Sequence, residues 1–426
     1  MNRIAIVALC ALALLTILVG AALYLTKTGV LASKQDAAHG YMKPVSDAAI
    51  SADLERLKSV EPTFPAIRKF FVDLADQDGG VYAFEVLKRA QLPPNTDLHL
   101  MGHAVGDELY KQQGLEGMKY CTNDFRNACS HSIVIGALLK DGMKVFDEVN
   151  AICQTAPGGP GAYTMCFHGF GHGVLAYVNY EFSDGVKLCE KVGTPEYHNE
   201  EASQCIGGMV MEMFQGQNDP QAWALKKDKY LSENDPLKLC EADFMPEDAK
   251  LLCYTYITPY IFQAAGAQDG NPTPDMFKKS FAFCDPVTDK TLRLACYGGL
   301  GKEFIVLAQD RDIRNIADTS DDRLKLTLSW CNMASKEEAK TSCITSVVDS
   351  LFWGGENDFH GSVRFCSFMD TAAHGNSCFA HLFDIASFYQ RDPSVRKAIC
   401  AAVPAAYQKM CTAQLLIGAV PPKSAS

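Results

Sequence analysis

The chain has 426 residues, of which 48% are hydrophobic and 21% are charged, and its formal net charge is −11. These values are typical of a folded globular protein and exclude a disordered one. The acidic balance argues against a nucleic-acid partner, because nucleic-acid binding requires a basic surface.

One apolar stretch near the N-terminus, residues 4–25, carries no charge and is long enough to cross a membrane as a helix. It exceeds the roughly 7–15 apolar residues of a cleaved signal peptide, although Val30-Leu31-Ala32 could be cleaved. We therefore expect a transmembrane signal anchor, with residues 1–3 in the cytoplasm and residues 26–63 as a stalk or linker.

Sixteen cysteines follow this stretch, and their spacing suits eight consecutive pairs. Separations of mostly 11 to 16 residues fit two neighbouring helices joined by a short loop, and they lack the tight spacing of most zinc and iron–sulfur sites. Because disulfides persist in oxidising compartments, the bulk of the chain is expected on the extracytoplasmic side, periplasmic or extracellular. We predict eight disulfides: Cys121 with Cys129, Cys153 with Cys166, Cys189 with Cys205, Cys240 with Cys253, Cys284 with Cys296, Cys331 with Cys343, Cys366 with Cys378, and Cys400 with Cys411.

The segments that follow the second cysteine of several pairs resemble one another. From Cys166 onward, successive second cysteines lie 33 to 48 residues apart, a period expected for stacked helix pairs. Sustained apolar/polar alternation, the signal of strands, is scarce. Three copies share a glycine at the fourth position: Cys166-Phe-His-Gly169, Cys205-Ile-Gly-Gly208 and Cys296-Tyr-Gly-Gly299. Three others keep the cysteine and lose the glycine: Cys253-Tyr-Thr-Tyr256, Cys343-Ile-Thr-Ser346 and Cys378-Phe-Ala-His381.

The predicted fold is therefore all-α: a disulfide-stapled helical-repeat (α-solenoid-like) array behind one N-terminal transmembrane helix. We expect a helical region with a histidine cluster over residues 64–180, Cys-paired helical repeats over 181–420 and a disordered tail over 421–426.

The expected helices contain an unusual number of glycines. Each glycine within a helix costs about 1 kcal/mol relative to alanine, so their presence needs an offset. Close approach of a neighbouring helix or a ligand would supply it. The glycines concerned are Gly169, Gly171, Gly173, Gly207, Gly208, Gly298, Gly299 and Gly301.

Five of the ten histidines lie between residues 99 and 172. His99 and His103 are four residues apart in a helix expected to begin near Thr96, so both rings project from one helix face. His168 and His172 repeat this spacing.

The fifth histidine, His131, follows Cys129 by two residues, just as His168 follows Cys166. The repeat therefore places His131 and His168 on equivalent faces of neighbouring units. We expect all five rings to converge on one layer.

Imidazole suits zinc, copper and iron, and an i,i+4 pair offers two ligands to one ion. The five histidines predict a site for one or two transition-metal ions, with Asp107 as a carboxylate ligand or a hydrogen-bond acceptor behind one. Non-covalent haem between two helices is the alternative cofactor. The sequence lacks H-E-x-x-H and C-x-x-C-H motifs, and hydrogen-bonded core histidines are an equally weighted reading.

Two glutamates, Glu212 and Glu303, occupy equivalent positions seven residues after Cys205 and Cys296. Glu212 is a candidate acid/base group because its repeat adjoins the histidine-bearing one. A solvated helix face, or the capping of a neighbouring loop, explains both residues equally well.

Two functions follow from these patterns. The first is a membrane-anchored extracytoplasmic protein that binds a transition metal or haem through the histidine cluster and carries out redox or hydrolytic chemistry. The second is a non-catalytic solenoid scaffold that binds another exported or membrane protein, which is the usual role of such arrays.

Overall fold

The computed structural model describes residues 43–94, 96–157, 160–267, 272–314, 316–354, 358–390 and 392–417. The expected membrane anchor at residues 4–25 and the expected tail at 421–426 lie outside these residues. Within the described ranges, no helix combines the length and the apolar character needed to span a membrane.

Every regular element of the described residues is a helix, so the predicted all-α class is confirmed. The α-helices are α3 (Asp47–Leu57), α4 (Phe64–Asp78), α5 (Gly80–Arg89), α6 (Leu98–Gln113), α7 (Asp124–Asp141), α8 (Phe146–Cys153), α9 (Pro160–Tyr177), α10 (Phe182–Cys189), α11 (His198–Gln215), α12 (Pro220–Tyr230), α13 (Glu247–Tyr256), α14 (Thr258–Ala264), α15 (Pro274–Cys284), α16 (Lys290–Ala308), α17 (Asp321–Cys331), α18 (Glu337–Gly354), α19 (His360–Cys366), α20 (Ala372–Tyr389), α21 (Pro393–Ala402) and α22 (Ala405–Cys411). Short helices η1 (Gly114–Tyr120), η2 (Gly142–Val145), η4 (Ile316–Asp318) and η5 (Thr412–Ile417) complete the described elements.

Several helices begin at a side chain that accepts a backbone N–H of the first turn. Asp289 caps α16 in this way, and Asp219 and Asp392 cap α12 and α21, each with a proline at the next position. The N-cap of α6 is Asp97, which accepts from Leu100 N at 3.1 Å. The sequence predicted that this helix begins near Thr96. The Thr96 side chain does not cap it and instead donates its hydroxyl proton to the Pro93 carbonyl.

All eight predicted disulfides are present, with Cα–Cα distances of 5.4–5.8 Å. In most pairs the first cysteine ends a short helix and the second lies within the helix that follows, as Cys153 of α8 and Cys166 of α9 do. Each bridge that closes a loop of this size stabilises the fold by about 3 kcal/mol in the chain-entropy model. Eight bridges indicate an oxidising extracytoplasmic or secreted location.

The three copies that lack the glycine are cross-linked in the same way as the others. The cysteines concerned are Cys253 in α13, Cys343 in α18 and Cys378 in α20, which are bonded to Cys240, Cys331 and Cys366. Their Cα–Cα distances of 5.6, 5.6 and 5.5 Å match those of the remaining bridges. The disulfide geometry of a helix pair therefore does not depend on the glycine that follows the second cysteine.

The helices that carry the second cysteines pack against one another in chain order. Helix α7 packs on α9, and the contacts continue in turn through α11, α13, α16, α18 and α20. Helix α6, which carries no cysteine, packs on the other side of α7 in the same order. Because α9 packs directly on α11, this stacking continues across residue 180. Whether the stack is a true repeat solenoid stays a prediction from the sequence.

The C-terminal part of the expected linker belongs to the packed body. Helix α3 packs on α5, and its Asp53 is buried. The Asp53 carboxylate accepts from the Tyr82 hydroxyl at 2.6 Å and from Lys43 Nζ at 2.9 Å. Tyr82 and Lys43 thus fix α3 in place.

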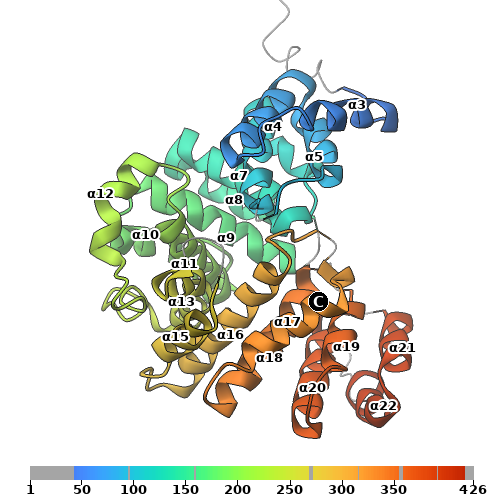
Figure 1. Ribbon diagram of the computed structural model, residues 1–426. Helices are drawn as coiled ribbons and strands as arrows, with labels where there is room; N and C mark the ends of the chain where they lie inside the picture. The colour runs from blue at the N-terminus through green and yellow to red at the C-terminus, as the bar shows by residue number, and fades with distance from the viewer. Residues whose placement is uncertain are drawn as a thin grey trace, which may run out of the picture.

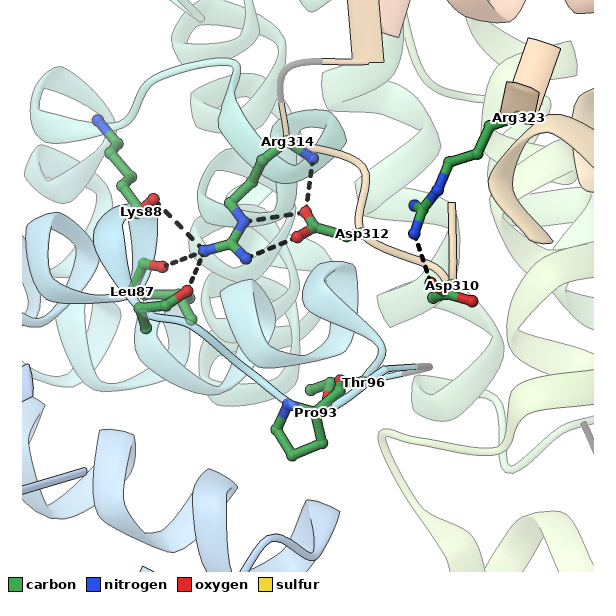
Figure 2. Close-up of polar contacts among 9 residues, drawn as sticks. Leu87, Lys88, Pro93, Thr96, Asp310, Asp312, Arg314 and Arg323 are labelled. Carbon is green, nitrogen blue, oxygen red and sulfur yellow. Dashed lines mark hydrogen bonds and ion pairs between the residues drawn. The ribbon is translucent and has the colours of Figure 1, made fainter. Parts of the chain in front are cut away.

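The stack curves, so that segments far apart in sequence meet (Figure 1). Arg314, which follows α16, donates to the carbonyls of Leu87, Lys88 and Ala90 at the C-terminal end of α5 (Figure 2). Asp312 holds the same guanidinium at 2.7 Å. This clasp joins the N-terminal helices to the later part of the array.

The Arg314 clasp should contribute measurably to stability, because a cation bonded to the last carbonyls of a helix satisfies groups that lack helical partners. We expect Arg314→Met to lower the free energy of unfolding by about 1–3 kcal/mol in urea titration. The control is Arg323→Met, because Arg323 forms an exposed pair with Asp310, and such pairs contribute less than about 1 kcal/mol. Equal effects of the two variants would contradict the role of the clasp.

His374 should make stability depend on pH. Hydrogen bonds to Asp370, at 2.8 Å, and to Glu337 raise the pKa of His374 above its ordinary value of 6.5. Its stabilisation is therefore complete below pH 6.5 and is lost as the pH rises through the raised pKa. Both carboxylates are exposed, so the contribution is small. We expect His374→Gln to lower the free energy of unfolding by about 0.5–1 kcal/mol just below pH 6.5 and by almost nothing near pH 9. A difference that does not change with pH would rule out the ionic contribution.

Candidate metal centre

The five histidines lie on α6, α7 and α9, and these helices and α11 pack closely at glycines. A Cβ atom at Gly106 of α6 would lie 2.7 Å from Ser132 Cβ of α7. A Cβ atom at Gly171 would lie 1.8 Å from the Cys205 carbonyl oxygen, and one at Gly208 would lie 1.9 Å from that of His168. At Gly169, a Cβ would lie 2.6 Å from His131 Cα. The glycines therefore sit where neighbouring helices touch, which supplies the offset that their helix cost requires.

This close packing brings the five histidine rings into one contiguous cluster. The rings of His99 and His103 have centroids 4.6 Å apart, and those of His168 and His172 are 5.2 Å apart. His131 lies between the two pairs, with its centroid 5.4–6.2 Å from each of the other four. The rings converge as the register of the repeat predicted.

Hydrogen bonds orient both rings of the first pair and fix the tautomer of His99. His99 Nδ1 lies 2.7 Å from the Phe125 carbonyl, which can only accept, so Nδ1 carries the proton. When the Ser132 hydroxyl donates to the His103 carbonyl at 3.0 Å, its oxygen accepts from His103 Nδ1 at 3.2 Å. In this arrangement both Nε2 atoms carry lone pairs, and they face each other at 3.2 Å.

Two lone pairs at this distance repel each other, and a cation between them would relieve the repulsion. A proton is not held between the two nitrogens near neutral pH, because burial lowers the pKa of His99 to about 4 and that of His103 well below its usual range. Neutral imidazoles are the form that binds metals. The pair is therefore ready to accept a metal ion.

His131 completes a group of three. One ring nitrogen from each of His99, His103 and His131 lies within 4.8 Å of the others, so these residues can hold a metal ion. Both nitrogens of His131 are buried and have no hydrogen-bond partner among the described residues. Buried polar atoms without partners are rare in folded proteins, and a ligand role would account for these two.

The second pair extends the cluster on the other side of His131. His172 Nδ1 bonds Glu212 Oε2 at 3.2 Å. Neither His172 Nε2 nor His168 Nδ1 has a partner in the part of the chain that the structure describes, and both are buried. A histidine that is oriented by a carboxylate and presents its other nitrogen is a common metal-ligand arrangement.

Glu212 itself is fully buried and makes several hydrogen bonds. It accepts from the Tyr180 hydroxyl at 2.5 Å and from Asn218 N and Nδ2 at 3.0 and 2.9 Å. This arrangement supports an orienting role for Glu212 behind His172 and the capping of the loop at Asn218. Its repeat equivalent, Glu303, pairs instead with Arg311 at 2.8 Å.

Asp107 is not in the group of three. Burial raises its pKa to about 6, and the neighbouring Ser132 opposes that rise. Because Ser132 also bonds His103, this geometry favours Asp107 as a group behind the ligands over a ligand itself.

A left-handed turn at the start of α7 shapes the site. Phe125, Arg126 and Asn127 have φ values of 53°, 56° and 63°, a conformation that costs about 1–2 kcal/mol for each non-glycine residue. The turn supplies the Phe125 carbonyl to His99 and places Arg126 in the wall of a cavity. No signal in the sequence marks this turn, because none of the three residues is a glycine.

A cavity of about 450 Å³ adjoins the cluster, and His99, His131 and His168 line it. Three further basic residues in its wall, Arg126, Lys302 and Arg311, were not predicted from the sequence. Burial lowers the pKa of Lys302 to about 7, and the neighbouring Arg126 adds to this shift. The Lys302 ammonium lies over the Tyr256 ring, 4.2 Å from its centroid.

The disulfides take no part in the site itself. No cysteine lines the cavity or belongs to the group of three histidines, and this includes Cys253, Cys343 and Cys378 of the glycine-free copies. Their sulfurs are committed to bridges and offer no thiolate to an ion. The cysteines therefore position the helices, and the histidines supply the chemistry.

No protein-family model, curated protein or solved structure matches this chain. The geometry of the site therefore carries the functional argument.

The glycine contacts can be tested at Gly208. Because a Cβ there meets backbone and not a flexible side chain, Gly208→Ala should force α9 and α11 apart and destabilise the protein by about 1–3 kcal/mol, measured by chemical denaturation. Gly161→Ala, in the facing helix α9, is the control, because a Cβ at Gly161 has no described atom within 4 Å. We expect it to be neutral or stabilising, and a neutral Gly208→Ala would contradict the contact.

Proposed function

We propose that the chain is an extracytoplasmic metalloprotein that binds a transition-metal ion through His99, His103 and His131. In this proposal, residues 4–25 tether it to a membrane, and the eight disulfides hold its helices in register in an oxidising compartment.

One observation carries the proposal. The unprotonated Nε2 atoms of His99 and His103 face each other at 3.2 Å in a buried site. Core histidines usually satisfy both ring nitrogens with protein or water, whereas this pair directs two acceptors at one point. Together with the unpartnered nitrogens of His131, the arrangement supports metal binding over a purely structural role.

The ligand chemistry narrows the metal. Three neutral imidazoles suit zinc, copper or iron. Haem between two histidines is disfavoured, because the rings already contact one another at centroid distances of 4.6–6.2 Å and leave no room for a porphyrin between them. His168 and His172, oriented by Glu212, would hold a second ion that shares His131.

Three protein ligands leave a coordination position free for water or substrate, as in catalytic sites. His99 and His131 both line the cavity, so this position would face it. A bound ion would supply Lewis-acid or redox chemistry there, and the protein would supply the histidine geometry and the adjoining cavity. We therefore propose hydrolytic or redox activity on a small molecule.

The test is His131→Leu in the full-length chain, purified from an oxidising compartment. Metal analysis after incubation with zinc, copper or iron should give about one equivalent or more in the parent and less than about a tenth in the variant. Leucine also removes two unpartnered nitrogens, so the metal-free variant should be as stable as the parent, or more stable by about 1 kcal/mol.

The matched control is His381→Leu, because His381 pairs with Asp349 at 2.6 Å outside the cluster. It should keep its metal and lose stability. If the parent takes up no metal, the proposal fails and the non-catalytic scaffold is left. If His131→Leu keeps its metal, the ligand assignment is wrong. His172→Ala in the same assay should remove only the second ion.

A further inference from the structure

The cavity beside the histidine cluster is assembled from distant parts of the chain. Its walls come from the starts of α6 and α7, from α9, α11, α13, α14 and α16, and from the loop at residues 311–313. A volume of about 450 Å³ is in the range of small-molecule sites. The cavity is thus large enough for a ligand that reaches the proposed metal centre.

The charges in its wall are unbalanced. Arg311 bonds Glu303, and Asp97 is engaged as the N-cap of α6. Arg126 and Lys302 have no hydrogen-bonded carboxylate or carbonyl among the residues that the structure describes, although Glu303 attracts both at longer range and Asp97 attracts Arg126. Two cations held near each other without a bonded counter-charge are unfavourable, and an anion between them would relieve this.

The apolar part of the wall indicates the rest of the ligand. Met165, Met211, Phe214 and Phe262 line the cavity together with Tyr256. A guanidinium offers a planar fork that matches a carboxylate or a phosphate, and lysine adds a compact positive charge. The wall therefore suits a molecule with one oxyanion group and an apolar or aromatic body.

We propose that this cavity binds a small organic anion whose carboxylate or phosphate lies between Arg126 and Lys302. Its apolar body packs against the methionines and aromatic rings and extends toward His99 and His131. The inference deepens the proposed function, because it names the substrate class that the metal centre would act on.

The test uses the full-length protein, both metal-loaded and metal-free, with benzoate, phenyl phosphate and the neutral benzyl alcohol as probes. Calorimetric titration should detect binding of at least one anion at millimolar concentration or below, and no comparable binding of benzyl alcohol. Benzoate and phenyl phosphate distinguish a carboxylate ligand from a phosphate ligand. Arg126→Gln and Lys302→Gln should each weaken anion binding by about tenfold or more.

The control is Lys325→Gln, because Lys325 also lies over an aromatic ring, that of Phe368, but does not line the cavity. Its anion affinity should equal that of the parent. A structural role for Arg126 or Lys302 predicts a lower melting temperature in the variants. A ligand-binding role predicts an equal or higher melting temperature without anion and loss of the rise that the anion produces.

Metal content measured in the same samples separates the two proposals. If the protein binds an anion but takes up no metal under any loading condition, the proposed metal centre is wrong and this inference remains. Metal uptake without binding of either anion, or equal binding of benzyl alcohol, would overturn this inference alone. Unchanged affinity in Arg126→Gln and Lys302→Gln would overturn it as well.

Discussion

The site depends on close contact between α6, α7 and α9, the three helices that carry the histidines. Gly102 and Gly106 of α6 leave no room for a Cβ against α7, and Gly169 of α9 leaves none against the backbone of His131. At ordinary helix separations of about 8–10 Å, larger side chains fill the interface. Here that space is missing, so imidazoles on three helices contact each other directly. The same glycines weaken the helices that carry them. The stabilisation by the disulfides offsets this cost.

Disulfides and strained backbone have complementary roles in this chain. Each bridge restricts the unfolded chain and pins a short helix to its longer neighbour. That stability supports features that are unfavourable by themselves, such as the left-handed turn at Phe125 to Asn127 and the unpartnered nitrogens of His131. Strain and unsatisfied polar atoms cluster at functional sites, and both occur here beside one cavity.

The two halves of the histidine cluster differ in what holds them. A backbone carbonyl and a serine hydroxyl orient His99 and His103, whereas a buried carboxylate orients His172. A carboxylate behind a histidine makes the ring a stronger ligand, so the halves would differ in affinity. The glutamates seven residues after Cys205 and Cys296 thus have different partners: Glu212 faces a histidine and Glu303 faces an arginine.

Local spacing in the sequence was enough to predict the helical class, the eight disulfide pairs and the convergence of the five histidines. Cysteines 8 to 16 residues apart and rings four apart on one helix face carry that information. The packed structure was needed to show which nitrogens face each other, that Glu212 lies behind His172, and that Arg126 and Lys302 share a cavity with the histidines. These features join residues as far apart in the sequence as His99 and Lys302. Such contacts depend on how helices stack and on a left-handed turn, and neither leaves a periodic pattern in the chain.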